Sequence, residues 1–184
     1  MQHLYWQPKM QSGFEALIFD EEKDALFVDS IVIGIENGEA FKLHYRIWLN
    51  HQWQVINFRI GHLPYGEEHK FYRDQKDCWS RGDFYGNDEG EWTNCTDLDI
   101  SCTPFTNTLP IRRLNLEIGQ SADINVLFVQ CPKLTVRTAL QRYERLSEFE
   151  YQFTGLESQF TAVITVDANG FVTNYPNLFE RKYE

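Results

Sequence analysis

Residues 26–49 read LFVDSIVIGIENGEAFKLHYRIWL and carry the clearest structural pattern in the chain. Side chains alternate between two faces through residues 26–36 and again through residues 40–49, the spacing expected of extended strands. Asn37-Gly38 lies between them and is the strongest short hairpin signal, because both residues readily adopt a positive φ. We therefore predict an antiparallel hairpin here. Both faces of its first strand are largely apolar, so that strand is expected to be covered on both sides or to line an apolar cavity.

The same pattern extends along the rest of the chain. Turn signals recur at intervals of about 8–12 residues and helical periodicity is scarce, which is typical of an all-β sandwich or barrel. Residues 121–131 indicate a strongly apolar strand, and residues 147–154 alternate between apolar and polar side chains. Residues 134–146 fit either a helix or a strand. A chain of this length is expected to form one domain over residues 1–184.

Residues 103–114, TPFTNTLPIRRL, interrupt the pattern. Pro104 and Pro110 fix their own φ, lack a backbone donor and favour extended geometry in the residue before them. We therefore predict a rigid loop over residues 103–110 and a strand that starts at Ile111. In that strand Arg112 would point to the same side as the apolar residues that follow it. Because an inward guanidinium needs a partner or a polar cavity, Arg112 either binds a buried acid or contacts a ligand.

These twelve residues resemble the signature of a bacterial family, the putative glycolipid-binding proteins. Weaker matches extend the resemblance along most of the chain, at Trp6, Gly13, Glu15, Tyr45, Arg46, Trp53, Cys95-x-Asp97-x-Asp99, Gln141-x-Tyr143, Asp167-x-x-Gly170 and Tyr175-Pro176-x-Leu178-Phe179. The resemblance implies a large, curved, mostly antiparallel β-barrel or roll, with a strand over most of residues 134–146. Such a shape can enclose a cavity for one amphipathic ligand.

The charge and composition of the chain limit the classes of partner that it is expected to bind. A net charge of −10 argues against nucleic acid, whose phosphates require a basic surface, and against bare anionic membranes. No window is long and apolar enough to span a membrane, and the first residues lack the pattern of an export signal, so we expect a cytoplasmic protein. The four cysteines, Cys78, Cys95, Cys102 and Cys131, lack metal-ligand spacing, and we predict neither a metal nor a cofactor.

The first functional hypothesis is non-enzymatic binding of a lipid or glycolipid. Apolar side chains would line the cavity for acyl chains, and polar groups would bind the head. The candidate polar residues are Asn107, Arg112, Arg113 and Tyr143. Either Trp53 or Trp48 would provide an aromatic face on which a sugar ring could stack.

The acidic residues allow other interpretations. Asp97 and Asp99 alternate with apolar residues, so both point to one face of a strand. They could act as the acid and base of an enzyme on a sugar- or lipid-like substrate, could pair with Arg112 or Arg113, or could face solvent. Glu15 could pair with an arginine such as Arg46 or Arg112, or could also face solvent.

A third hypothesis is a protein-interaction module that uses an exposed sheet edge or aromatic patch. The sequence specifies neither the ligand nor the oligomeric state.

Overall fold

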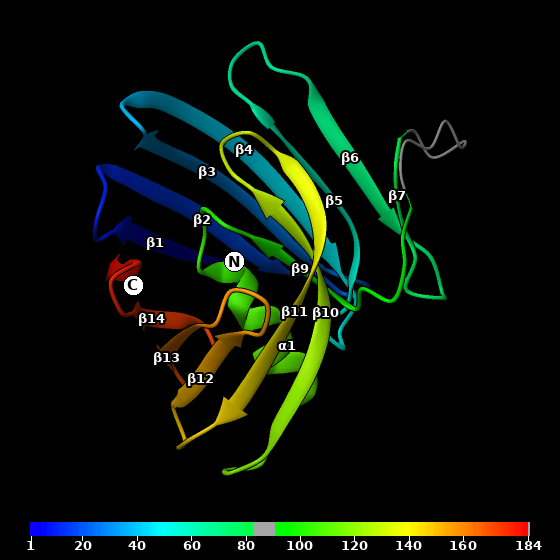
Figure 1. The fold of residues 1–184 in the computed structure, drawn as a ribbon. Helices are drawn as coiled ribbons and strands as arrows, with labels where there is room; N and C mark the ends of the chain where they lie inside the picture. Colours follow the sequence, from blue (N-terminus) through cyan, green and yellow to red (C-terminus); the bar gives the residue numbers. More distant parts are fainter. Residues whose placement is uncertain (83–90, 184) are drawn as a thin grey trace.

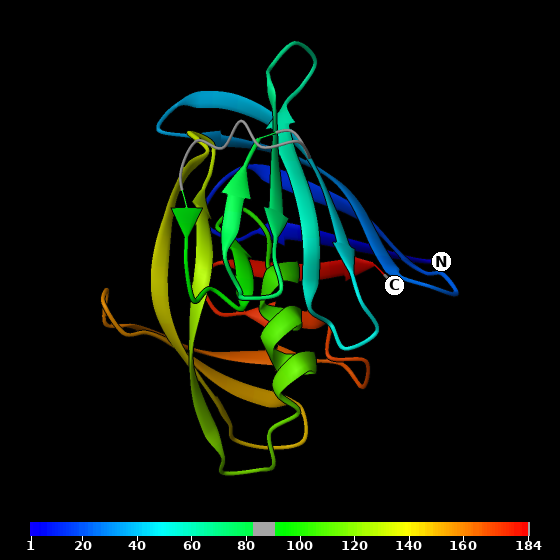
Figure 2. The same cartoon turned by 90° about the vertical axis from the view of Figure 1, so that its right-hand side faces the viewer.

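The computed structural model describes residues 1–82 and 91–183. Its strands are β1 (Gln2–Pro8), β2 (Gly13–Glu21), β3 (Leu26–Glu36), β4 (Glu39–Leu49), β5 (Val55–His62), β6 (Glu68–Arg73), β7 (Trp79–Arg81), β8 (Glu91–Trp92), β9 (Asp97–Ile100), β10 (Ser121–Gln130), β11 (Thr135–Arg145), β12 (Glu150–Gly155), β13 (Phe160–Val166), β14 (Val172–Tyr175) and β15 (Phe179–Tyr183). They form one curved sheet in the order β8-β7-β6-β5-β4-β3-β2-β1-β15-β14-β13-β12-β11-β10-β9. Figures 1 and 2 show how this sheet curves back on itself.

The sheet is mostly antiparallel, as predicted, with β9 and β10 as its parallel pair. Within the described residues its end strands, β8 and β9, do not pair with each other, so the sheet remains open. The all-β class and the large curved sheet are confirmed, and the shape is a roll and not a closed barrel. Residues 87–91 read NDEGE, which indicates a polar turn, and they lie mostly outside the described residues.

The predicted hairpin is present as β3 and β4. The strands pair from Leu26 opposite Leu49 to Glu36 opposite Glu39. Asn37 and Gly38 form the turn with φ values of 51° and 83°, which explains why these two residue types suit the position. The strand interpretation of residues 134–146 is also confirmed, because β11 covers Thr135–Arg145.

The outer face of β3 contradicts one of the two predicted arrangements, which is burial on both sides, whereas Val32 lines a cavity as the other arrangement expects. Leu26, Val28 and Val32 point to the concave side and are buried, whereas Ile31, Ile33 and Ile35 are 40–47% exposed. The strand is therefore not covered on both sides. A single open sheet has only one inner face, so a run that is apolar on both faces does not prove double burial.

Residues 105–114 contradict the prediction of a loop followed by a strand. They form the α-helix α1 (Phe105–Leu114), with Pro104 at its start and Pro110 inside it. Figures 1 and 2 place α1 within the curve of the sheet. The consecutive residues 105–111 are all buried, so the helix has no broad polar face and no amphipathic pattern by which the sequence could reveal it.

The ends of α1 follow general rules of helix geometry. A proline at the start is tolerated, because the first N–H groups of a helix have no internal partner. Asn115 closes the helix in the left-handed region, with φ 46° and ψ 48°. Arg112 and Arg113 lie in the last turn, where cations interact favourably with the helix dipole.

The core divides into two clusters that meet at α1. One cluster is bounded mainly by β1–β7 and includes Phe105 and Leu109; the other is bounded mainly by β10–β14 and includes Ile111. The helix therefore joins the two halves of the roll. Among the described residues, no helix is both long and apolar enough to cross a membrane.

Candidate ligand-binding groove

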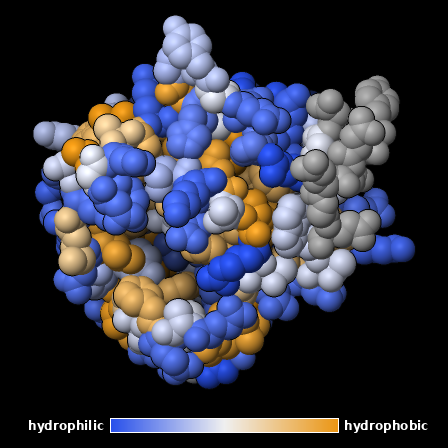
Figure 3. Space-filling view, turned by 45° about the horizontal axis from the view of Figure 1, so that its top comes forward, coloured by the Kyte–Doolittle hydropathy of each residue, from blue (hydrophilic) through white to orange (hydrophobic). Residues whose placement is uncertain are grey.

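Two adjoining cavities form a groove on the concave side of the roll. Their volumes are about 290 Å³ and about 580 Å³, and both are lined by Ser101, Phe128, Arg137, Leu178 and Phe179. We call the smaller cavity the inner part and the larger one the outer part. Figure 3 shows the surface hollowed, with polar and apolar side chains around the hollow.

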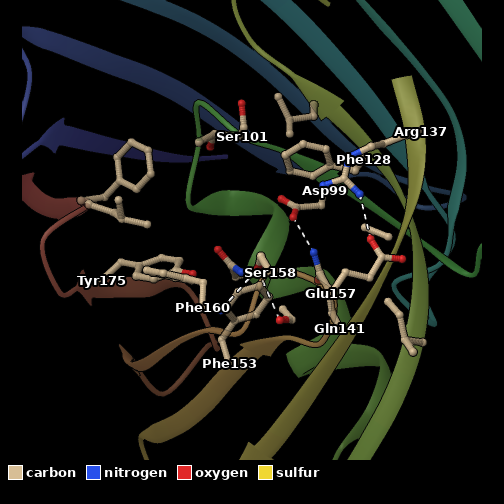
Figure 4. A pocket seen from close by; sticks show the side chains of 18 residues that line it. Asp99, Ser101, Phe128, Arg137, Gln141, Phe153, Glu157, Ser158, Phe160 and Tyr175 are labelled. Carbon is tan, nitrogen blue, oxygen red and sulfur yellow. Dashed lines mark hydrogen bonds and ion pairs between the residues drawn. The ribbon is translucent and has the colours of Figure 1, made fainter. Parts of the chain in front are cut away.

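The floor of the inner part is polar. Gln141 Nε2 donates to Asp99 Oδ2 at 2.6 Å, and Thr106 Oγ1 donates to Asp99 Oδ1 at 3.2 Å. Burial raises the pKa of Asp99, although these two hydrogen bonds oppose the shift. Beside them, Asn107 Nδ2 donates to the Tyr143 hydroxyl at 2.8 Å. Figure 4 shows Asp99 and Gln141 facing each other across this floor.

One atom of the floor lacks a partner. Gln141 is 4% exposed, and its Oε1 has no hydrogen-bond partner among the described residues. A buried carbonyl oxygen without a partner costs about 1–3 kcal/mol, so such atoms are uncommon in folded proteins. Gln141 lines the inner part, so this unpaired oxygen belongs to a side chain in the wall of the groove.

The outer part also has apolar walls. Its walls include Val32 and Phe41 from the β3–β4 hairpin, together with Leu178 and Phe179 near the C-terminal end. Apolar surface of this kind releases water favourably when it is covered by hydrocarbon. The groove thus combines polar groups with apolar walls in both of its parts.

An ion pair lies beside the junction of the two parts. Arg137 Nη1 is 3.1 Å from Glu157 Oε2, and the two side chains are 54% and 62% exposed. The Arg137 guanidinium also lies over the Phe128 ring, 4.7 Å from its centroid. Exposed ion pairs contribute little to stability, so this one can open at low cost when the groove is occupied.

Comparison with known proteins identifies relatives of the whole chain. The family model described as "Putative glycolipid-binding" matches residues 3–181. The chain belongs to this family.

One solved structure is similar over nearly the whole length of both proteins. It is the crystal structure of a DUF1089 family protein from Pseudomonas aeruginosa, with 33% sequence identity and a TM-score of 0.79. The match covers 91% of this chain and 92% of the other. The comparison with curated proteins found no match.

The structure separates the candidate residues of this family member into three places. Asn107 lines the inner part of the groove, and Tyr143 is buried behind it as its hydrogen-bond partner. Arg112, Arg113 and Trp53 line a different pocket, described below.

Trp48 lies apart from both. It points to the outer face of β4, where it contacts Phe27 and the Arg59 guanidinium. The candidates therefore do not form one site.

Arg112 does not point into the core with apolar residues, because α1 replaces the predicted strand. It is exposed, and its Nη1 donates to the Asn169 carbonyl oxygen at 2.6 Å. The interpretation that Arg112 binds a buried acid is therefore wrong. The buried acid instead binds the next residue: Arg113 Nε and Nη2 donate to Asp97 Oδ1 and Oδ2 at 3.0 and 2.6 Å.

Asp97 and Asp99 have different environments although they share a face of β9. Asp97 is 1% exposed and its carboxylate is held by Arg113, which confirms the interpretation that one acid pairs across the signature. Asp99 lines the groove. The two acids therefore do not flank a common space, as the acid and base of a hydrolase must.

Among the described residues Glu15 pairs with no arginine, and it does not face solvent, contrary to both expectations. It is 2% exposed and accepts hydrogen bonds from Ser30 Oγ at 2.8 Å and from the Tyr45 hydroxyl at 2.5 Å. Burial raises the pKa of Glu15 to about 7. Arg46 points to the other side of its strand and pairs with Glu68.

Sequence reasoning missed most of the groove. The sequence predicts Asp99 to be a catalytic, pairing or solvent-facing residue, and it indicates Gln141 only through the family resemblance. The two lie 42 positions apart and are brought together because β10 pairs with both β9 and β11. The one available signal was the Gln141-x-Tyr143 match, which places two polar groups on one face of a strand.

Proposed function

We propose that this protein binds one amphipathic molecule of the lipid or glycolipid class in the groove, without catalysing a reaction. The observation that carries the proposal is a groove of two adjoining cavities in which buried polar groups, among them the unpartnered Oε1 of Gln141, lie among apolar walls. The family description supports the same ligand class.

The polar head would lie in the inner part. Gln141 Oε1 and the Asp99 carboxylate offer acceptors, so the head must donate hydrogen bonds, as hydroxyl groups do. Asn107 would contact the head, and Tyr143 would hold the Asn107 amide in place through its hydroxyl.

The hydrocarbon would lie in the outer part. Covering the rings of Phe41 and Phe179 with an acyl chain would contribute roughly 25 cal/mol for each Å² removed from water. Cavities of a few hundred Å³ typically enclose most of a small ligand, so the two parts together suit one molecule with a short chain.

The binding test is native mass spectrometry of protein purified without detergent, followed by solvent extraction and incubation with a total lipid extract. We expect a stoichiometric adduct whose extracted mass is that of a lipid or glycolipid. A mass that equals the bare chain before and after incubation would contradict the proposal.

The variant Gln141→Met tests the polar floor. Methionine has a similar length but no amide, so we expect about tenfold weaker binding of the extracted ligand, which corresponds to the loss of one buried hydrogen bond. The affinity is measured by titration of the delipidated protein. Gln7→Met, at an exposed position of β1, is the matched control and should bind like the native chain. Equal affinities for all three proteins would exclude Gln141 from the site.

A further inference from the structure

A second pocket lies at the C-terminal end of α1. Its volume is about 550 Å³, and it shares no lining residue with the groove. We call it the arginine pocket, after its lining residues Trp53, Ile111, Arg112, Arg113, Arg145 and Tyr151. In a chain with 17 basic and 27 acidic residues, three arginines around one pocket are a local reversal of the overall charge.

The Arg112 guanidinium is held by three segments of the chain. It extends from α1, lies 4.7 Å from the centroid of the Trp53 ring and donates to the Asn169 carbonyl oxygen. Gly170 leaves room for it, because a Cβ at that position would lie 2.8 Å from Arg112 Cδ. The side chain is therefore ordered before any ligand arrives, which lowers the entropic cost of binding.

Trp53, on the opposite side of the contact with Arg112, is also held in place by its neighbours. Its φ is 62°, a left-handed backbone conformation that is rare for a bulky residue. The ring stacks on Phe19 at 5.4 Å, and the Arg112 guanidinium lies over it. Backbone strain of this kind persists only where the surroundings enforce it, and it is common at binding sites.

The charges of the pocket are only partly neutralised. Arg113 is neutralised by Asp97. Arg145 donates to the carbonyl oxygens of Leu116, Ser147 and Glu148, which carry no net charge. Within the described part of the chain, neither Arg112 nor Arg145 forms an ion pair with a carboxylate.

Two acids also border the pocket. Asp167 is already paired with Arg181 and accepts hydrogen bonds from the backbone N–H groups of Asn169 and Phe171. Glu148 is exposed at the rim and opposes an incoming anion. Two fixed cations therefore face one acid.

We propose that the arginine pocket binds a phosphoryl group, with Arg112 as the principal contact and Arg145 as the second cation. A guanidinium presents a planar set of donors that matches two oxygens of a phosphate. Because the chain as a whole is acidic and repels anions at a distance, binding depends on this local geometry. The site is separate from the groove, and the inference stands whether or not the groove holds a lipid.

The test is a titration of the full chain with inorganic phosphate at constant ionic strength. Binding is monitored by NMR through the chemical shifts of the arginine Nε–H and tryptophan indole N–H groups. We expect saturable shifts of the Arg112 and Trp53 signals. Arg112→Met should weaken binding about tenfold, because one charge-assisted contact is lost. Arg142→Met, which removes an exposed arginine paired with Asp123 on the neighbouring strand, should leave phosphate affinity unchanged.

Two further variants keep the test decisive if Arg112→Met fails to fold. Glu148→Gln should strengthen phosphate binding, because it removes the opposing charge at the rim, and Arg112→Lys should weaken it, because the ammonium cannot form two parallel contacts. No saturable shift in the native chain, or no change in affinity with either variant, would overturn the proposal.

The source of the phosphoryl group is tested separately. Glycerol phosphate in solution is compared with phosphatidylcholine vesicles that contain or lack phosphatidic acid. Binding to glycerol phosphate alone supports a soluble phosphate ester, and Arg112-dependent binding to the acidic vesicles supports a lipid head group. Binding to neither would refute the inference.

Discussion

Replacing Asp97 by alanine is expected to destabilise the protein by about 3–5 kcal/mol, the range observed when one partner of a buried ion pair is removed. Asp97 is 1% exposed and Arg113 is 18% exposed, so the guanidinium left behind cannot be fully hydrated. The pair joins β9 to the last turn of α1, which itself connects the two core clusters. The loss should appear in urea unfolding as a lower midpoint.

A double-mutant cycle separates the interaction energy of the Asp97–Arg113 pair from the other contacts of these two side chains. Asp97→Leu with Arg113→Met replaces both charges by apolar side chains, and this double variant should be much more stable than either single one, because no buried charge is left alone. Asp123→Ala is the control, since the Asp123–Arg142 pair has similar geometry but is exposed, and we expect little change. If Asp97→Ala is no less stable than Asp123→Ala, the pair does not stabilise the fold.

Local signals in the sequence were sufficient to predict the β3–β4 hairpin. The β3–β4 hairpin follows from side-chain alternation and from Asn37-Gly38, because both depend only on neighbouring residues. The exposure of Ile31, Ile33 and Ile35 could not be predicted, since it depends on whether another layer covers that face. The composition of a strand does not determine what packs against it.

The helix α1 could not be predicted because its surroundings determine it. Pro110 lowers the intrinsic helix propensity, and burial of residues 105–111 removes the amphipathic pattern that identifies helices. Packing between two halves of the sheet outweighs the local preference. Arg112 was therefore assigned the wrong orientation, because the two-residue side-chain alternation of a strand was applied to residues that form a helix.

The candidate site was predictable only where residues are adjacent in sequence or in the family signature. The pairing of Asp97 with Arg113 was one of three alternatives, since β9 leads directly into the signature. The contact between Asp99 and Gln141 depends on the order β9-β10-β11, which includes a parallel pair. No sequence pattern fixes that order.

The second large expected effect is a loss of stability as the pH rises, caused by Glu15. Burial raises its pKa in the folded protein from 4.5 to about 7. Between these values the folded state holds a proton that the unfolded state has released, so the free energy of unfolding falls as the pH increases. The contribution is complete below about pH 4.5 and is lost once the pH exceeds about 7, for a total of about 3 kcal/mol.

Glu15→Gln should remove this dependence, because glutamine stays neutral. We expect the difference in unfolding free energy between the variant and the native chain to shift in favour of the variant by about 3 kcal/mol between pH 4.5 and pH 8. The measurement is urea unfolding at intervals across that range. Glu22→Gln, at an exposed position in the β2–β3 turn, should give a constant difference. A constant difference for Glu15→Gln as well would show that Glu15 is ionised at its ordinary pKa.

Tyr45→Phe tests the physical cause of the shift. The Tyr45 hydroxyl lies 2.5 Å from Glu15 Oε1, and this hydrogen bond opposes the effect of burial by stabilising the carboxylate. Without it the pKa of Glu15 should rise further, so the pH-dependent loss should extend to higher pH. The same hydroxyl is 3.1 Å from Thr103 Oγ1, which accepts from the Phe105 N–H at the start of α1. Ionisation of Glu15 should therefore disturb the N-terminal end of α1 first, and hydrogen exchange at Phe105 should increase with pH more in the native chain than in Glu15→Gln.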